Sequence, residues 1–129
     1  MGKTVRLPFT VTRADMDAFA RLSGDVNPLH RDAAIARHAG FEGPVVYGAM
    51  IVAKVSWLLG MHLPGTGGVW TGIRMDFRNP LYADQPAEIS AEIADRSEST
   101  RMLTIKIVVE AGGRRIASGA AEMKILDLG

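Results

Sequence analysis

A long apolar segment runs from Pro44 to Gly60, and it constrains the fold of this chain more than any other feature. Apart from Lys54 and Ser56 it is apolar nearly all round, so a helix formed here belongs in the interior of a protein. A strand is the competing interpretation, but the length of the segment favours a helix. Because the chain has 129 residues, we expect one domain spanning residues 1–129, built around this helix.

The hydropathy pattern changes to a period of two from Val69, which is typical of strands that bury one face. The first such strand is expected to bury Val69, Thr71, Ile73, Met75 and Phe77. Later strands alternate likewise, with the sets Ile89, Ala91, Ile93; Leu103, Ile105, Ile107, Val109; and Ala117, Gly119, Ala121, Met123, Ile125. Gly112-Gly113 is a hairpin signal. We therefore predict an α+β fold in which an antiparallel sheet wraps around the helix, and small residues of the last strand let the two approach closely.

The N-terminal part of the chain predicts one more strand and two short helices. Residues 5–11 alternate as a strand, and the proline within it restricts that strand to a sheet edge because proline has no backbone donor. Thr12 and Asp15 form a near capping box, which starts a helix that ends at Ser23-Gly24. A second helix is expected from Asp32 to about His38.

Composition excludes several classes of function. The absence of cysteine rules out a disulfide scaffold, a thiolate zinc site, an iron–sulfur cluster and a cysteine nucleophile. A net charge of +1 provides no strong field for nucleic acid or a lipid surface. The first ten residues lack the apolar core of a signal peptide, and no apolar stretch approaches the ~20 residues of a membrane helix. We expect a soluble, cytoplasmic protein.

The polar loop over residues 24–32 carries the best candidates for chemistry. His30 can exchange a proton near neutral pH, and Asp25 lies five residues upstream. With the turn-forming Asn27-Pro28 between them, the two side chains could converge on one water and share acid and base roles. Alternatively Asp25 only hydrogen-bonds the loop's own backbone in an Asx turn, which spacing alone favours. A metal site with Asp32 is a further interpretation, made awkward by the proline and the short spacing.

Three residues of the apolar segment allow a functional and a structural interpretation. Gly48, near the start of the helix, would let a substrate carbonyl approach a free N–H, or it would only permit close packing. Ser56 would bond a carbonyl one turn earlier and lacks the surroundings of a nucleophile. Lys54 must reach water, a carboxylate or a subunit interface, and reaching water is the favoured interpretation.

Two motifs make the chain recognisable. The sequence FARLSGDVNPLHRD at residues 19–32, followed by FEGPVVYG at residues 41–48, resembles the MaoC-like hydratases, in particular the short (R)-specific enoyl-CoA hydratases. The resemblance continues through Ser56 and the stretch containing Phe77, Pro80 and Asp84, and it covers essentially the whole chain. The DVNPLH loop with the downstream PVVYG is a fairly specific signal, and it outweighs the Asx-turn interpretation of Asp25.

The resemblance implies a hot-dog fold, assembled as a homodimer or a higher homo-oligomer, and an enzyme. Such enzymes reversibly add water to trans-2-enoyl thioesters to give (R)-3-hydroxyacyl thioesters. Asp25 and His30 match the catalytic pair that holds the water, and Gly48 matches the backbone donor to the thioester carbonyl. Ser56 matches a serine that lines the site. No metal or redox cofactor is implied, and coenzyme A carries the substrate.

We place three more residues in the substrate-binding set: Asn27, Tyr47 and Trp57. Tyr47 stands where the related enzymes commonly have histidine, and Lys54 and Trp57 stand where they tend to have apolar or small residues. Trp57 could narrow an acyl pocket and favour short chains. These departures leave the shape of the acyl pocket open.

Three other functions remain as alternatives. A 3-hydroxyacyl dehydratase acting on an acyl-carrier protein would share the chemistry and need a positive patch, for which the candidates are Arg96, Arg101, Arg114 and Arg115. A non-catalytic thioester-binding subunit is disfavoured by the intact Asp25 and His30. A thioesterase is disfavoured because the helix from Tyr47 to Leu59 has no carboxylate.

Overall fold

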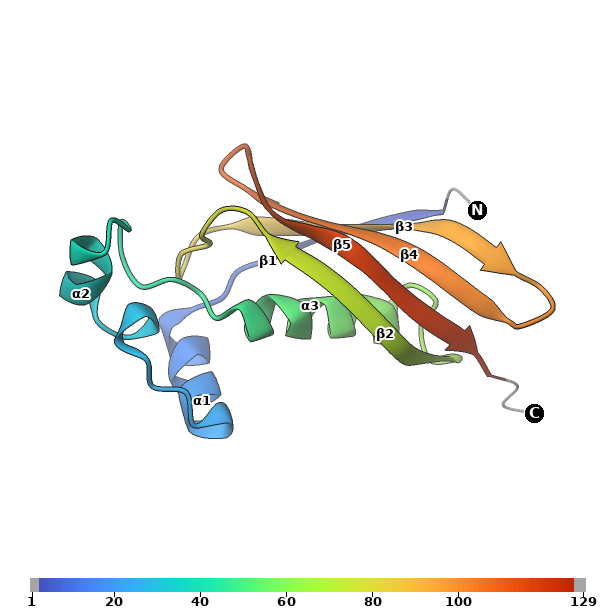
Figure 1. The fold of residues 1–129 in the computed structure, drawn as a ribbon, viewed down its shortest axis with the longest axis horizontal. Helices are drawn as coiled ribbons and strands as arrows, with labels where there is room; N and C mark the ends of the chain where they lie inside the picture. The colour runs from blue at the N-terminus through green and yellow to red at the C-terminus, as the bar shows by residue number, and fades with distance from the viewer. Residues whose placement is uncertain (1–2, 127–129) are drawn as a thin grey trace.

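The computed structural model describes residues 3–126 and consists of one curved sheet with a helix against its inner face (Figure 1). In chain order the elements are β1 (Thr4–Phe9), α1 (Arg13–Ser23), a 3₁₀ turn η1 (Pro28–His30), α2 (Ala33–His38), α3 (Gly48–Met61), β2 (Gly68–Phe77), β3 (Ala87–Ser97), β4 (Met102–Ala111) and β5 (Arg114–Ile125). Within residues 3–126, no helix has the length and hydropathy needed to cross a bilayer.

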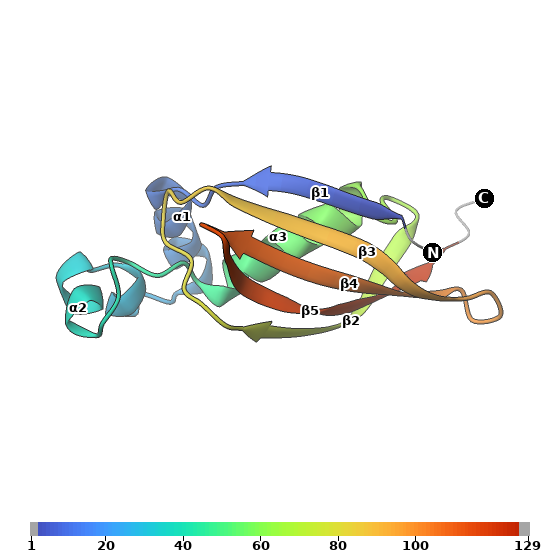
Figure 2. The same cartoon turned by 90° about the horizontal axis from the view of Figure 1, so that it is seen from above.

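The sheet has five strands in the order β1-β3-β4-β5-β2, and every neighbouring pair is antiparallel. Viewed from above, α3 runs beneath the sheet, while α1 and α2 lie together beyond one end of it (Figure 2). The prediction that the first strand lies at an edge is confirmed, and Pro8 stands within it. The Gly112-Gly113 hairpin is confirmed too, because both glycines have positive φ, 57° and 73°.

The core forms between α3 and the inward residues of β3, β4 and β5. Every residue predicted to face inward on β4 is buried, as are Ala117, Ala121 and Met123 of β5. From α3, the buried side chains are Ile51, Val55, Leu58 and Leu59. The period-two pattern therefore predicts these faces correctly.

Gly119 of β5 is required for a different contact from the one expected. A Cβ added there would overlap the carbonyl oxygen of Arg74 and lie 2.8 Å from the sulfur of Met75, both on the neighbouring strand β2. The close approach that Gly119 permits is therefore between two strands rather than between the sheet and α3. The prediction that Gly119 lets the sheet approach the helix was wrong, because the element that comes close to Gly119 is the strand β2.

The helix predicted from Pro44 begins only at Gly48. The backbone N–H of Val45 donates to the carbonyl of Leu29 at 3.1 Å, and that of Val46 donates to the carbonyl of Leu81 at 2.8 Å. These bonds keep the chain extended up to Tyr47, the N-cap residue. Because both acceptors lie far away in the sequence, the apolar pattern does not show where the helix starts.

The expectation that α3 is buried all round is also wrong for the single chain. Its exposed side carries Ala49, Ala53, Ser56, Trp57 and Gly60. The sheet covers the opposite side, where the buried residues of α3 are found. A sheet of five strands reaches only part of the way around the helix, so a strip of small and apolar residues stays uncovered (Figure 1).

A bulge in β2 reverses the predicted face of its first half. The pairing with β5 shifts between Trp70 and Gly72, which leaves Thr71 as the extra residue. As a result Trp70 packs against the core, while Val69 is 42% exposed. Of the predicted inward set, only Met75 packs against the core. Ile73 and Phe77 share its face but are 41% and 52% exposed, so the prediction that this strand buries them is wrong for the single chain.

Candidate active site

The loop after α1 is built from consecutive side-chain-to-backbone hydrogen bonds. Gly24 ends α1 with φ +80°, and the hydroxyl of Ser23 then accepts the N–H of Asp25 at 3.0 Å. Asp25 Oδ1 accepts the N–H of Asn27, and Asn27 Oδ1 accepts that of Leu29, both at 3.0 Å. The Asx turn considered above as an alternative for Asp25 is therefore present, and a second one is formed by Asn27. They use one oxygen of Asp25, whose Oδ2 has no partner among residues 3–126.

The 3₁₀ turn places His30 against the segment that leads into α3. Its Nδ1 lies 2.6 Å from the carbonyl oxygen of Val45. Since a carbonyl only accepts, Nδ1 carries the hydrogen in this contact, and in the neutral ring Nε2 is left with its lone pair. The ring is half-buried, and its orientation is set by this bond.

Tyr47 connects the two predicted catalytic residues. Its hydroxyl donates to the backbone carbonyl of Asp25 at 2.7 Å. Its ring stacks on His30 with centroids 4.1 Å apart and lies 4.8 Å from the ring of Phe19. Tyr47 is only 2% exposed. One buried side chain thus holds both the Asp25 loop and the His30 ring against the start of α3.

Gly48 is the first residue of α3, and its N–H has no acceptor among the described residues. The preceding Tyr47 makes no side-chain cap. The N-terminal end of α3 therefore presents free N–H donors and the positive end of the helix dipole. A Cβ at Gly48 would meet Phe77 Cζ at 3.2 Å, so the glycine also permits close packing of that ring. The functional and structural interpretations of Gly48 are compatible.

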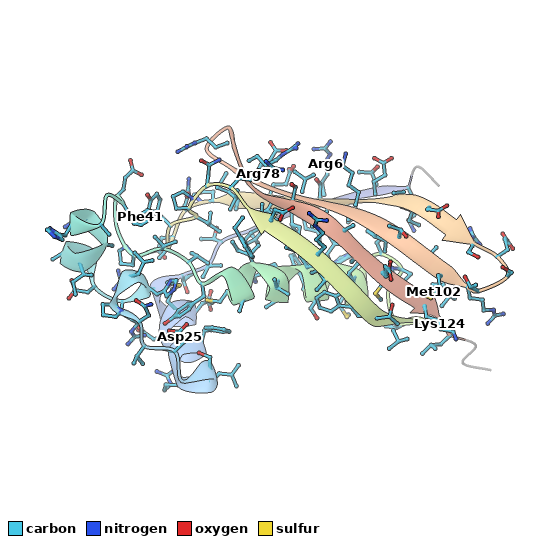
Figure 3. The ribbon with its side chains drawn as sticks, in the orientation of Figure 1. Arg6, Asp25, Phe41, Arg78, Met102 and Lys124 are labelled. Carbon is cyan, nitrogen blue, oxygen red and sulfur yellow. The ribbon has the colours of Figure 1, made fainter. Side chains whose placement is uncertain are left out.

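His30 and Gly48 line one cavity of about 400 Å³. Its other lining residues are Phe41, Val45, Val46, Ile51, Phe77, Arg78, Asn79, Pro80 and Leu81, so its wall is largely apolar and holds no carboxylate. Figure 3 labels Asp25 on the loop after α1, Phe41 on the connection from α2 to α3, and Arg78 beyond β2. Phe77 and Pro80 belong to a stretch that the family resemblance covers, whereas Arg78 and Asn79 carry no motif that marks them as lining a site.

Asp25 does not line this cavity and is joined to it through Tyr47. Asp32, considered above as a third metal ligand, caps α2 by accepting the N–H groups of Ala34 and Ile35. Within residues 3–126, no three acidic, histidine or cysteine side chains converge on a point that suits a metal ion.

Ser56 and Trp57 lie apart from the other candidates within one chain. They follow Gly48 by eight and nine residues on α3, which at 1.5 Å per residue is roughly 12 Å along the helix axis. Both lie on the exposed side of α3. The Trp57 ring is edge-on to His62, with centroids 5.6 Å apart, and does not line the cavity.

Lys54 is half-buried and passes between aromatic rings. Its Nζ lies 5.9 Å from the ring centre of Phe9 and 5.5 Å from that of Trp57. The pKa of Asp15 is lowered, first by the hydrogen bond from the Thr12 backbone and to a smaller extent by the positive charge of Lys54, while burial opposes both. Lys54 thus faces rings and a nearby carboxylate, and it lies outside the His30 cavity.

The chain belongs to the MaoC-like domain family, whose model matches residues 1–113. It is a hot-dog fold enzyme of the hydratase and dehydratase class, a hydro-lyase.

The relatives agree with this class. The (R)-specific enoyl-CoA hydratase of Aeromonas caviae is 32% identical over 126 residues, covering 97% of this chain and 94% of the relative. The solved (R)-hydratase from A. caviae superposes with a TM-score of 0.92 at 33% identity, covering 96% of this chain and 95% of that one. A mitochondrial 3-hydroxyacyl-[acyl-carrier-protein] dehydratase of Arabidopsis thaliana is 34% identical over 82 residues, covering 64% of this chain and 48% of the relative.

Proposed function

We propose that this enzyme catalyses the reversible, (R)-specific hydration of trans-2-enoyl-CoA to (R)-3-hydroxyacyl-CoA. The observation that carries the proposal is the convergence of His30 and the free N–H of Gly48 on one largely apolar cavity. An enoyl thioester needs an apolar wall for its acyl chain, a donor for its carbonyl and an acid–base group near the double bond. The similarity to the A. caviae hydratase supports the same reaction.

In the proposed mechanism, Asp25 and His30 hold a water between them. One of the pair removes a proton as the water oxygen bonds to the β-carbon, and the pair supplies a proton to the α-carbon. The two groups act as a coupled unit, so the steps are assigned to the pair. The N–H of Gly48 donates to the thioester carbonyl and stabilises the negative charge that develops on its oxygen. We expect no metal or redox cofactor to take part.

The remaining residues of the proposed site have two kinds of role. Asn27 holds the start of the 3₁₀ turn, and the buried Tyr47 holds the Asp25 loop and the His30 ring. Ser56 and Trp57 would contact substrate only where a second chain covers the exposed side of α3. We propose that the enzyme acts as a homodimer in the cytoplasm and that this uncovered strip is part of its interface.

The stereochemistry of the product tests the proposed function. Crotonyl-CoA is incubated with the enzyme, and the 3-hydroxybutyryl product is hydrolysed and resolved by chiral chromatography. We expect the (R) product alone. An (S) or racemic product contradicts the proposal, and free coenzyme A released without hydration indicates a thioesterase instead.

A 3-hydroxyacyl-[acyl-carrier-protein] dehydratase is the second candidate, and the Arabidopsis relative favours it. The four arginines considered as a docking patch divide between opposite ends of the sheet. Arg96 and Arg101 lie at the β3–β4 hairpin, and Arg114 and Arg115 at the β4–β5 hairpin (Figure 1). They form no single patch. Kinetics with the same acyl group on coenzyme A and on a carrier protein separate the two functions.

A further inference from the structure

The end of the Phe77 ring lies against the first residue of α3, where the last turn of β2 comes to the helix (Figure 1). A Cβ on Gly48 would have three ring atoms as its nearest neighbours outside the adjacent backbone: Cζ at 3.2 Å, and Cε1 and Cε2 at 3.5 Å. The nitrogen of Gly48 lies about 2.5 Å from that Cβ position, because the backbone geometry is fixed. Since Gly48 and Phe77 line one cavity, a group in it that accepts the Gly48 N–H lies beside the ring.

The backbone that carries the Phe77 ring is fixed. Phe77 is the last residue of β2 and pairs in register with Ala117 of β5. The N–H groups of the next two residues, Arg78 and Asn79, both donate to the carbonyl of Ile116, at 2.8 and 3.2 Å. Phe77 is nevertheless 52% exposed, so much of its surface stays open to a ligand.

A second ring with a fixed position borders the same space. His30 lines the cavity, and its ring is held by the carbonyl of Val45 and by stacking on Tyr47. The space around the Gly48 N–H is therefore bounded by two rings that separate contacts hold in place. A substrate group placed there meets a rigid boundary, which tolerates additional volume poorly.

We propose that Phe77 makes the enzyme select against enoyl thioesters that carry a substituent on the α-carbon. This inference rests on the proposed function, in which the Gly48 N–H donates to the thioester carbonyl. The α-carbon is bonded directly to that carbonyl carbon, so it is the first atom of the acyl chain beside the ring. A linear substrate has only hydrogen at this atom, whereas a methyl group there competes for the volume that the Phe77 ring occupies.

Two substrates that differ only at the α-carbon test this proposal. They are crotonyl-CoA and its 2-methyl derivative, tigloyl-CoA, and the absorbance of the enoyl thioester follows both. The methyl group also changes intrinsic reactivity, so the informative quantity is how the ratio of the two kcat/KM values differs between variants. For Phe77→Leu we expect this ratio to shift toward tigloyl-CoA by roughly 10- to 100-fold, the discrimination that one methyl group supports in a fitted pocket. An unchanged ratio overturns the proposal.

Two control variants separate the ring beside Gly48 from other causes. Phe41→Leu enlarges the same cavity by the same change of side chain, at a residue that is not among the atoms nearest to Gly48. Ile73→Leu alters the same face of β2 at a residue that does not line the cavity. Both should keep the wild-type ratio. An equal shift in Phe41→Leu would show that the volume of the whole cavity sets the preference, and it would refute the role of Phe77.

Binding of saturated thioesters tests the inference without turnover. Propionyl-CoA and isobutyryl-CoA differ by one methyl group on the α-carbon, and neither can be hydrated. In calorimetric titrations, we expect the wild type to bind propionyl-CoA more tightly and Phe77→Leu to lose this preference. Equal affinities in the wild type, or no binding of either thioester, refute the inference. If Phe77→Leu does not fold, Phe77→Met removes the ring and keeps a flexible apolar side chain for the same measurements.

The two kinds of measurement distinguish failure of the inference from failure of the proposed function. If the wild type does not hydrate crotonyl-CoA, the proposed function fails. A preference for propionyl-CoA that depends on Phe77 then still supports the selection against an α-substituent. If crotonyl-CoA is hydrated and neither the ratio nor the preference depends on Phe77, the proposed function stands and the inference fails.

Discussion

At the scale of single residues, the site depends on Tyr47 more than on any contact between Asp25 and His30 themselves. Its hydroxyl holds the backbone of the Asp25 loop, and its ring lies flat against His30. The next residue, Gly48, presents the backbone donor. One buried side chain therefore fixes the positions of all three candidate groups: the Asp25 loop, the His30 ring and the N–H of Gly48.

Replacing Tyr47 by phenylalanine separates the two contacts. Tyr47→Phe keeps the ring on His30 and removes the hydrogen bond to the Asp25 carbonyl. Since a hydrogen bond of this kind contributes about 1 kcal/mol, we expect kcat to fall roughly five- to tenfold with KM unchanged. Steady-state kinetics with crotonyl-CoA measures this, and Tyr47→Leu, which loses both contacts, should be slower still. A rise in KM at constant kcat would instead show that the hydroxyl binds substrate.

At the scale of secondary-structure elements, α1 is fixed by a capping box that the sequence predicts. Thr12 Oγ1 accepts the N–H of Asp15 at 3.1 Å, and Asp15 Oδ2 accepts the N–H of Thr12 at 3.0 Å. The end of α1 leads directly into the Asp25 loop. A loosened α1 would therefore disturb the loop that carries the candidate chemistry.

The capping box predicts a pH dependence of stability. The pKa of Asp15 is lowered in the folded state by the bond from Thr12, so its contribution is fully present above the unfolded value of about 4. It is lost as the pH falls through the lower folded pKa. We expect Asp15→Asn to be less stable than wild type at pH 7 and the difference to vanish in acid. Urea unfolding at several pH values measures it, and a difference that grows in acid contradicts the assignment.

The close pairing of β2 with β5 predicts that Gly119 cannot be replaced by any residue with a side chain without loss of stability. Gly119→Ala would place a methyl group on the Arg74 carbonyl, and overpacking of this kind costs about 1–3 kcal/mol. Gly67→Ala is the matched control, since a Cβ at Gly67 meets nothing within 4 Å. Thermal unfolding compares them. Equal melting temperatures for the two variants would show that β2 does not pair with β5 at this distance.

Local patterns predict most of the fold and part of the site. The inward faces of β3, β4 and β5, the edge strand and the capping box depend on neighbouring residues, so they can be predicted. The start of α3 depends on hydrogen bonds to Leu29 and Leu81, and the bulge at Thr71 depends on the register with β5. Both are contacts between distant parts of the chain, so a local sequence pattern does not predict them. The same holds for the site: the resemblance of the DVNPLH loop to the family marks Asp25 and His30, which their spacing alone does not. The contacts of Tyr47 and the Phe77 ring over Gly48 arise from tertiary packing.

At the scale of the whole molecule, the exposed strip of α3 predicts self-association. The strip contains Ala53, Ser56 and Trp57, which are exposed to solvent in a single chain although α3 is largely apolar. Ala53→Arg would place a charge on this strip, and we expect the wild type to sediment at twice the mass of the chain and the variant at the mass of one chain. Ala34→Arg, at an exposed position of α2, is the control and should remain dimeric. A monomeric wild type contradicts the proposed interface.

The most direct test of the account is the turnover of crotonyl-CoA by Asp25→Asn and His30→Gln, followed by the absorbance of the enoyl thioester. Asparagine keeps an oxygen for the Asn27 N–H, so the turn survives while the acid–base group is removed. We predict that each variant remains folded and loses kcat by roughly 10²–10⁴. The controls His38→Gln and Asp95→Asn, at exposed positions, should retain wild-type turnover. Near-wild-type rates for both Asp25→Asn and His30→Gln would contradict the proposed catalytic pair.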